Sequence, residues 1–491
     1  MDRQDRVRVA GNQPYGCRQG PDLLMTLGRS GPTFWPKACH VPVPATPLDL
    51  PYLIATQPAL SQRFGWQRHP AEWWVSWLNG TPREGMGASY ATVYAGHQFG
   101  TYVPQLGDGR ALGLGFCKDM DGISWECQLK GSGLTPFSRM GDGRAVLRSS
   151  IREYLCSEHM IGLGIPSTRA MALMGSATQV RRETWESAAV LLRLAPTFVR
   201  FGTLQYLAHT GQTEALDQLM AALLQRHGGE HSIKDWFLSI CDSSGRLCAA
   251  WQAVGFCHGV LNTDNMSVHG LTLDYGPFGF VETYDPGYVC NHSDDQGRYA
   301  YWAQPEIVEW NLFQLGRALA RYFPDTVIQT GLHHYNAVFS TTYLQKMSEK
   351  LALPSTQVTW SFIQNMITMM TQSGVDYTLF LRQLSVDPFD PSWVKHAAIN
   401  PAPVLVWLDQ YRSQRTQDSY VLARMFQVNP AYVLRNWVAQ FVIDEAEAGR
   451  TEVVHAVCEI LRRPYEAHPE WAHLQQPAPA QYRGLSVSCS S

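Results

Sequence analysis

The amino-acid sequence predicts an α+β fold in which a small strand-rich lobe precedes a larger helical lobe, with a cleft between the two. Short apolar segments alternate with glycine clusters between residues 90 and 135, as they do in twisted strands joined by tight turns. Beyond about residue 205 the apolar pattern is mostly helical up to about residue 463, apart from a glycine- and aspartate-rich stretch over residues 255–297. The polar motifs therefore fall in loops between a sheet and a set of helices.

These patterns divide the 491 residues into four segments. They are a poorly ordered leader over 1–45, the strand-rich lobe over 46–205, the helical lobe over 206–465, and an extended Pro/Gln/Ser-rich tail over 466–491. Within the strand-rich lobe we expect helical packing over 47–80, an amphipathic helix over 143–162, and a strand and turn over 188–202. The amphipathic helix is predicted from apolar residues spaced i, i+4, i+7 and i+8 from Leu147 onward.

Composition argues against several classes of protein. Hydrophobic residues make up 45% of the chain and charged residues 16%, which is enough for a sizeable core. The formal net charge of -3, without any run of five Lys or Arg residues, argues against a dedicated nucleic-acid binder. The sequence has neither an 18-residue apolar stretch nor an apolar region behind its N-terminus that would form a secretory signal. We therefore expect a cytoplasmic protein without nucleic-acid or membrane partners.

The eleven cysteines form neither a Cys-x-x-Cys pair nor a Cys/His cluster with zinc-ligand spacing. An odd number of cysteines in a long chain is typical of reduced, intracellular thiols. Cys489 lies third from the end of the chain, where the simplest interpretation is a loose tail with a free thiol.

Glycines dominate the first motif, Gln105–Gly115. Gly107, Gly109 and two later glycines would let the backbone approach an anion, and Arg110 adds a fixed positive charge. The spacing differs by one residue from the kinase and dinucleotide glycine patterns, and the sequence has no Walker A motif. A hairpin with glycine turns therefore remains an alternative to a nucleotide-binding loop.

A lysine and a glutamate form the second motif. Lys130 ends a short apolar run, and Glu153 follows 23 residues later on the predicted helix. Protein kinases hold ATP phosphates with a strand lysine that is paired with a helix glutamate. Asp142 and Gly143 lie between the two, where the N-terminus of a helix would face an anion. The alternative is a surface lysine and a solvated glutamate, whose pairing would contribute little.

Two arginines, Arg193 and Arg200, stand in an apolar segment and form the third motif. A buried guanidinium needs a carboxylate or a phosphate as its partner. The sequence leaves both interpretations open, an anion site and structural pairing with Asp or Glu.

The fourth motif, His258–Asn265 followed by Leu273–Gly276, is the most specific of the four. In protein kinases a His-x-Asp loop leads to a metal-binding Asn, and an Asp-x-Gly sequence follows about ten residues later. Asn265 and Asp274 stand at the corresponding places and could hold a magnesium ion through their oxygen atoms.

One position does not fit a kinase. Val260 stands where kinases carry the catalytic Asp, and valine cannot accept a proton from a substrate hydroxyl. Asp264, directly before Asn265, is the nearest replacement carboxylate. Phosphoryl transfer by the usual kinase base is therefore not the expected reaction.

Together these motifs resemble the selenoprotein O family, kinase-fold proteins that transfer AMP from ATP to protein hydroxyls. The resemblance covers roughly residues 45–491. The segments that carry it are Tyr94–Gly100, Gln105–Arg110, Gln128–Gly133, His258–Met266, Asp274–Gly279 and Cys290–Tyr299.

The resemblance implies a protein-kinase-like two-lobed fold, with a small β-rich N-lobe and a larger helical C-lobe that carries extensions. It implies ATP and protein substrates, with Mg²⁺ or Mn²⁺ as the metal. The nucleotide would bind upside down relative to a kinase, so that its α-phosphate faces a Ser, Thr or Tyr hydroxyl and pyrophosphate leaves. The valine at position 260 and the two extra arginines agree with this, because the charge of the metal and the arginines would then supply most of the catalysis.

The resemblance also implies a role for each residue of the motifs. The nucleotide would be lined by Gly107, Gly109, Arg110, Asp142 and Gly143. The remaining roles are Lys130 as a phosphate ligand paired with Glu153, Arg193 and Arg200 as ligands of the inverted nucleotide, Asn265 and Asp274 as metal ligands, Asp274 also beside the nucleotide, and Asp264 as the proton acceptor.

For the tail, the resemblance implies a redox function. Many eukaryotic members of the family carry selenocysteine near the C-terminus, and bacterial members resemble this chain in having a cysteine, here Cys489. The family suggests a disulfide between this cysteine and Cys290, which would make the activity redox-sensitive.

Two other functions remain alternatives. One is a small-molecule or protein kinase, against which Val260 argues. The other is a pseudokinase that binds nucleotide without catalysis. The presence of Lys130, Glu153, Asn265 and Asp274 argues against the second, because a pure scaffold needs none of them.

Overall fold

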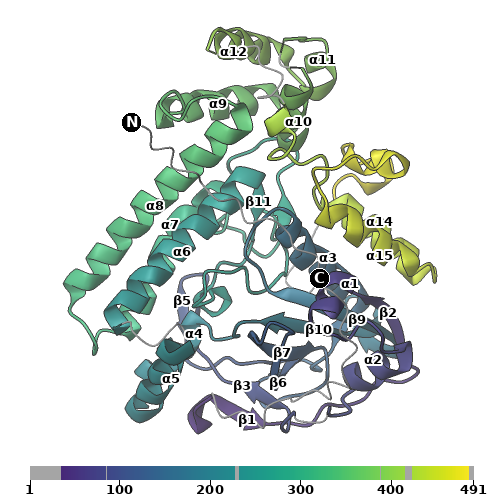
Figure 1. Ribbon diagram of the computed structural model, residues 1–491, viewed down its shortest axis with the longest axis vertical. Helices are drawn as coiled ribbons and strands as arrows, with labels where there is room; N and C mark the ends of the chain where they lie inside the picture. Colours follow the sequence, from purple (N-terminus) through teal and green to yellow (C-terminus); the bar gives the residue numbers. More distant parts are fainter. Residues whose placement is uncertain (1–34, 84–85, 227–231, 388, 415–422, 486–491) are drawn as a thin grey trace, which may run out of the picture.

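The computed structural model describes residues 35–83, 86–226, 232–387, 389–414 and 423–485 (Figure 1). It confirms a mixed α+β protein, with an antiparallel sheet in the N-terminal region and helices in the C-terminal region. Within these ranges no helix is both long enough and apolar enough to cross a bilayer.

The sheet of the N-terminal region has eight strands, and neighbouring strands are antiparallel. Its order is β1 (His40–Pro42), β3 (Tyr90–Thr92), β6 (Ala111–Lys118), β7 (Ser124–Lys130), β10 (Trp185–Ala195), β9 (Arg169–Arg181) and β2 (Tyr52–Thr56), with the short β8 (Ala145–Val146) paired to β10. A separate hairpin is formed by β4 (Gly96–Gln98) and β5 (Thr101–Val103).

The sheet differs from the sequence-based expectation at three places. Residues 40–42 lie in the segment expected to be a poorly ordered leader, yet they pair with β3, and Cys39 beside them is buried. β2 lies in the segment expected to be helical, ahead of α1 (Pro58–Arg63) and α2 (Ala71–Leu78), because it closes the sheet edge against β9. The 13-residue β9 was not expected, since most of its first half is buried and shows no alternating pattern.

Helix α3 (Leu147–Gly162) matches the predicted amphipathic helix and packs between the sheet and two helices from the far end of the chain (Figure 1). These are α14 (Asn436–Glu447) and α15 (Glu452–Arg462). The helix begins at Leu147 rather than at residue 143, because the two residues before it form β8 against β10. Its last residue is glycine because a Cβ there would lie 2.5 Å from the carbonyl oxygen of Leu461.

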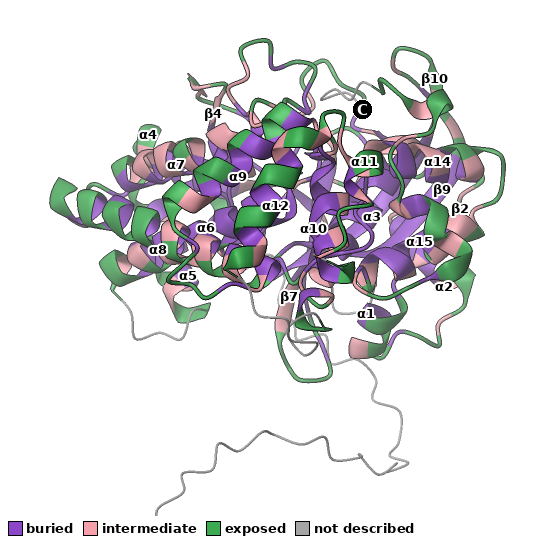
Figure 2. Ribbon diagram, turned by 90° about the horizontal axis from the view of Figure 1, so that it is seen from above, coloured by how far each residue is buried: buried purple, intermediate pink, exposed green. Residues whose placement is uncertain are grey.

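The C-terminal region is built on three long helices that run side by side, α6 (Ile233–Val254), α7 (Gln304–Ala318) and α8 (Asp325–Leu351) (Figure 1). Further helices flank them: α4 (Phe201–His209), α5 (Thr213–Arg226), α9 (Trp360–Ser373), α10 (Tyr377–Val386), α11 (Val394–Ala397) and α12 (Pro401–Ser413). Their inner faces are buried and their outer faces exposed (Figure 2).

Between α6 and α7 the chain is irregular, as the glycine- and aspartate-rich pattern predicted. This stretch holds the 3-10 turn η2 (Thr263–Asn265) and the short pair β11 (Phe256–Cys257) and β12 (Gly279–Phe280). The segment after residue 466 was expected to be extended, but it contains two 3-10 helices, η4 (Pro469–Gln475) and η5 (Ala480–Tyr482). Leu474 in the first of these is buried, Gln475 donates to the Tyr432 hydroxyl at 2.8 Å, and Tyr482 donates to Asp444 at 2.9 Å, so that several contacts hold the segment against the helices.

A buried carboxylate, Glu126 on β7, ties the sheet to the segment that leads into α4. It accepts hydrogen bonds from the Trp35 indole (2.8 Å), the Tyr90 hydroxyl (2.9 Å), the Thr197 hydroxyl (2.9 Å) and the Phe198 amide (2.8 Å). Because its donors come from three different segments, this side chain sets the distance between β7 and the loop after β10.

Replacing Glu126 by alanine should lower the free energy of unfolding by about 3 kcal/mol, because four buried donors lose their acceptor together. Chemical denaturation measures the change. Glu183→Ala, an exposed glutamate of the β9–β10 hairpin, is the matched control and should change it by less than about 0.5 kcal/mol. Equal stabilities of the two variants would contradict this account of Glu126.

Candidate active site

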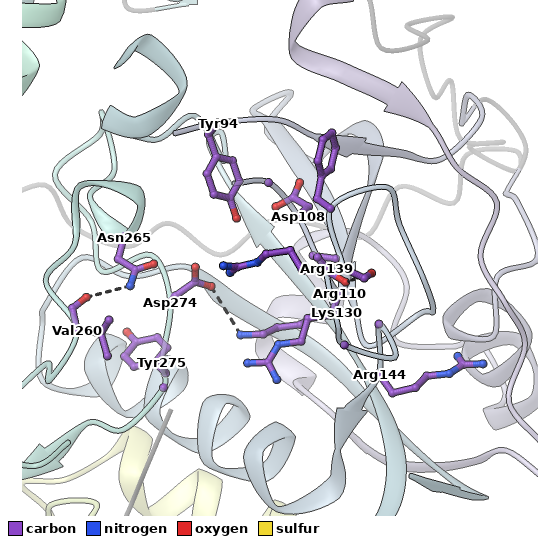
Figure 3. Close-up of a pocket in the computed structure, with 18 of the residues that line it drawn as sticks. Tyr94, Asp108, Arg110, Lys130, Arg139, Arg144, Val260, Asn265, Asp274 and Tyr275 are labelled. Carbon is purple, nitrogen blue, oxygen red and sulfur yellow. Dashed lines mark hydrogen bonds and ion pairs between the residues drawn. The ribbon is translucent and has the colours of Figure 1, made fainter. Parts of the chain in front are cut away.

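A cavity of about 400 Å³ opens between the sheet and the irregular stretch that follows α6 (Figure 3). Most of the site residues predicted from the sequence line it, namely Gly107, Gly109, Arg110, Lys130, Asp142, Gly143, Arg193, Arg200, Asn265 and Asp274. Seven basic side chains and three aspartates line the wall, so that its formal net charge is +4. A partly enclosed cavity lined with a net positive charge attracts anions and raises their local concentration.

The glycine motif forms one wall of the cavity, in the loop that leads into β6. A Cβ on Gly107 would lie 2.4 Å from the Phe137 ring, and one on Gly109 would lie 3.0 Å from the Phe137 carbonyl oxygen. These glycines therefore let the loop pack closely against the segment before β8, which forms the adjoining wall.

Lys130 and Glu153 are paired as the second motif predicts. The Lys130 ammonium lies 2.5 Å from Oε2 of Glu153 and 3.7 Å from Oδ1 of Asp274, and both carboxylates come from outside the sheet. Glu153 does not line the cavity but lies behind Lys130, with 4% of its side chain exposed. Burial lowers the pKa of Lys130, and the two carboxylates oppose that shift.

Both arginines of the third motif hold the same carboxylate. Arg193 contacts Oδ1 of Asp274 at 2.5 Å, and Arg200 contacts Oδ2 at 2.6 Å. Arg193 also lies 3.1 Å from Glu153, and the two guanidiniums are 2% and 4% exposed. Burial disfavours the charged form of Asp274, but attraction by Arg200, Arg193 and Lys130 outweighs it and holds the pKa of this carboxyl well below its usual range.

Both residues predicted to hold a metal line the cavity, and Figure 3 shows the Asn265 side chain pointing toward Asp274. The side-chain amide nitrogen of Asn265 donates to the carbonyl oxygen of Val260 at 2.9 Å. The side-chain oxygen of Asn265 therefore points toward Asp274. An amide oxygen and a carboxylate suit a hard divalent cation. The described residues contain no group of three His, Cys, Asp or Glu that could hold a metal alone, so phosphate oxygens and water would have to complete the coordination.

Comparison with known proteins decides the family. Residues 35–462 match the family described as Protein adenylyltransferase SelO. A protein of Myxococcus xanthus (strain DK1622), named Protein nucleotidyltransferase YdiU, is 45% identical over 416 residues, which cover 82% of this chain and 85% of the relative. A protein of the same name from Aeromonas salmonicida (strain A449) is 44% identical over 481 residues, which cover 95% of this chain and the whole of the relative.

The chain belongs to the SelO protein adenylyltransferase family. It is therefore an enzyme of the nucleotidyltransferase class, as the family resemblance implied. Its family implies ATP as a substrate.

Asp264, like Glu153, is a predicted site residue that does not line the cavity of this SelO-family enzyme. It lies in η2, only 7% exposed, and its backbone carbonyl accepts a hydrogen bond from Arg200 at 2.7 Å. Burial raises the pKa of its carboxyl to about 6, against the attraction of Arg200. Val260, which stands in place of a kinase base, does line the cavity.

Several lining residues were not singled out from the sequence. They include Tyr94, Asp108, Phe137, Arg139, Arg144 and Arg182. Arg182 binds both oxygens of Asp142, at 2.7 and 3.0 Å, from a hairpin 40 residues away. No local pattern could have linked that pair, whereas Tyr94 stands within one of the segments that carried the family resemblance.

The disulfide between Cys290 and Cys489 stays a prediction, because Cys489 lies outside the described residues. Cys290 is buried beside Gly259, where a Cβ would lie 2.5 Å from its sulfur atom. Burial raises the pKa of the Cys290 thiol, which lowers its reactivity as long as it stays covered.

Asp274→Asn should lower the free energy of unfolding by about 3 kcal/mol, because Arg193 and Arg200 lose the carboxylate that neutralises them in a buried place. Added pyrophosphate should restore part of the loss, since it can bind the freed guanidiniums. Thermal unfolding with and without pyrophosphate measures both effects. Asp242→Asn, which breaks an exposed pair with Arg246, is the control and should change stability by less than about 1 kcal/mol. Wild-type stability of Asp274→Asn would show that the arginines do not depend on this carboxylate.

Proposed function

We propose that this enzyme transfers AMP from ATP to Ser, Thr or Tyr hydroxyls of proteins and releases pyrophosphate. Its sheet and helical regions would form the small and large lobes of a protein-kinase-like fold. The observation that carries the proposal is that Arg193, Arg200 and Lys130 line the cavity and converge on one carboxylate, Asp274, together with valine at position 260. The cavity is thus rich in phosphate ligands but lacks the kinase base.

The position of the cations supports an inverted nucleotide. Arg193 and Arg200 are buried, and Lys130, with 12% of its side chain exposed, lies 3.7 Å from the Asp274 carboxylate that both arginines contact. Bound there, the β- and γ-phosphates would exchange the Asp274 carboxylate for their own oxygens. The α-phosphate would then lie toward Asn265 and η2, which is the side where Asp264 lies.

These positions of the phosphates, the cations and Asp264 imply the following reaction. The oxygen of the acceptor hydroxyl bonds to the α-phosphorus, the bond between that phosphorus and the bridging oxygen to the β-phosphorus breaks, and pyrophosphate leaves. The proton of the hydroxyl passes to Asp264, and Lys130, Arg193 and Arg200 stabilise the charge that develops on the departing phosphates. Asn265 and Asp274 would hold a Mg²⁺ or Mn²⁺ ion, whose chemistry is to neutralise phosphate charge.

ATP labelled at the α- or the γ-phosphate separates this proposal from a kinase. With the reduced protein and magnesium, we expect label to enter protein from α-labelled ATP only. Asp274→Ala should abolish incorporation, because it removes a proposed metal ligand, whereas Asp242→Ala on the outer surface should not. Incorporation from γ-labelled ATP alone would overturn the proposal and make the protein a kinase, with Asp264 as the base to examine next.

The arginine contacts of Asp274 also predict how metal binds. Both oxygens of the carboxylate are engaged without nucleotide, so Mn²⁺ should bind weakly to the protein alone. A non-hydrolysable ATP analogue should tighten Mn²⁺ binding at least about tenfold, because its phosphates draw the arginines away, and Mn²⁺ should tighten the analogue equally. Electron paramagnetic resonance of free Mn²⁺ measures this, after subtraction of Mn²⁺ bound by the analogue itself. Equal Mn²⁺ affinity with and without the analogue would contradict the exchange of partners.

A further inference from the structure

One wall of the nucleotide cavity is formed by the loop between β7 and β8, which we name the wall loop (residues 131–144). It is anchored at two places. The Thr135 hydroxyl donates to the carbonyl oxygen of Asp108 in the glycine motif at 2.7 Å, and the Arg144 guanidinium donates to the carbonyl oxygen of Thr46 at 2.7 Å. The segment between these anchors has to be fixed by other contacts.

That segment, residues 139–142, has little packing of its own. Arg139 and Gly141 are exposed, Met140 is fully exposed, and 39% of the Asp142 side chain is exposed. A segment without buried apolar contacts opens easily unless polar contacts hold it. The position of Asp142 in the cavity wall therefore depends on its hydrogen bonds.

Arg182 supplies these hydrogen bonds from the turn of the β9–β10 hairpin. Its Nη1 lies 2.7 Å from Oδ2 of Asp142, and its Nη2 lies 3.0 Å from Oδ1. Nη1 also donates to the carbonyl oxygen of Arg181 at 2.8 Å, and Nη2 donates to that of Arg144 at 2.9 Å. Each of these nitrogens carries two hydrogens, so the four contacts use all of them. Although Arg182 lines the cavity, its terminal nitrogens are committed to the wall loop and the hairpin rather than to a phosphate.

The same contacts keep Asp142 ionised. Burial favours the neutral form of its carboxyl, but the hydrogen bonds from Arg182 and from the Arg144 amide outweigh burial and lower the pKa of Asp142. An ionised carboxylate can only accept hydrogen bonds. In ATP the donors are the ribose hydroxyls and the amino group of the base, whereas the phosphates are negatively charged acceptors. This part of the wall therefore suits the nucleoside and not the phosphates.

We propose that Arg182 is a positioning residue for nucleotide binding, which bridges Asp142 and the carbonyl of Arg144 so that the wall loop presents the Asp142 carboxylate to the nucleoside of ATP. The proposal rests on the proposed nucleotide site, but not on which group of ATP is transferred. It gives the turn of the β9–β10 hairpin, where Glu183 and Thr184 are exposed, a part in ATP binding.

The test measures binding of a non-hydrolysable ATP analogue and of pyrophosphate, each with Mg²⁺, by isothermal titration calorimetry. Arg182→Ala should raise the dissociation constant of the analogue at least about tenfold, because the Asp142 carboxylate is no longer held in place for the nucleoside. The dissociation constant of pyrophosphate should rise less than about threefold, because only the long-range attraction of one charge is lost. Arg181→Ala is the matched control, since this neighbouring arginine is exposed and does not line the cavity, and it should leave both constants at their wild-type values.

Two further variants test the bridge itself. Arg182→Lys keeps the positive charge, but an ammonium group lacks the planar fork that spans both partners, so analogue binding should stay weaker than in the wild type. If Arg182→Ala fails to fold, Arg182→Lys carries the test. In an Asp142→Ala background, Arg182→Ala should change the dissociation constant of the analogue less than about twofold, because residues that act as a unit are not additive.

Three outcomes would overturn the positioning role. They are wild-type binding of the analogue by Arg182→Ala, equal losses of analogue and pyrophosphate binding, and wild-type binding by Arg182→Lys, which would leave charge as the only contribution. Failure of the wild-type protein to bind the analogue would instead overturn the nucleotide site. Transfer of the γ-phosphate in place of AMP would overturn the proposed reaction and leave these binding results as they are.

Discussion

Asp274 is the point at which the parts of this enzyme meet, because one carboxylate is shared by two buried arginines. Arg193 lies on β10 and Arg200 directly before α4, whereas Asp274 lies in the irregular stretch between α6 and α7. Glu153 of α3 joins the same cluster through Arg193 and Lys130. The sheet, the helix behind it and the helical region are therefore tied together by charges that would be costly to bury apart.

The same cluster of charges explains how the buried arginines can stabilise the fold and also form a binding site for anions. Buried guanidiniums need an oxygen anion, and without nucleotide the protein supplies its own. In the proposed nucleotide complex, phosphate oxygens would replace this carboxylate at the two arginines, and the Asp274 carboxylate would turn to the metal ion. The formal charge of +4 on the cavity wall favours the exchange, since the phosphates bring negative charge into a wall with a surplus of basic groups.

Close backbone approach is the second constraint around the site. Gly96, Gly107 and Gly202 each sit where a Cβ would overlap a neighbouring segment, at 2.2 Å from Asp264, 2.4 Å from Phe137 and 2.0 Å from the Ala95 carbonyl oxygen. These contacts bring the hairpin, the glycine loop and α4 onto the elements that carry the charged residues. Gly96 lies in β4 and Gly202 in α4, and close packing holds these elements against segments that lie outside their own strand ladder or helix.

The amino-acid sequence was sufficient to predict the α+β order of elements, the helix that carries Glu153, most of the motif residues that line the cavity and the family of the protein. Local spacing was sufficient for these, because helical periodicity and loop motifs are properties of neighbouring residues. The contact partners of these residues could be seen only in the folded chain. It gave Arg193 and Arg200 a common carboxylate, placed Asp142 against Arg182, and covered Asp264 with Gln98 rather than exposing it to the cavity. Each of these pairs joins residues 40 or more apart, and at such separations the contact depends on strand order and on how helices pack over the sheet, which a single sequence does not state.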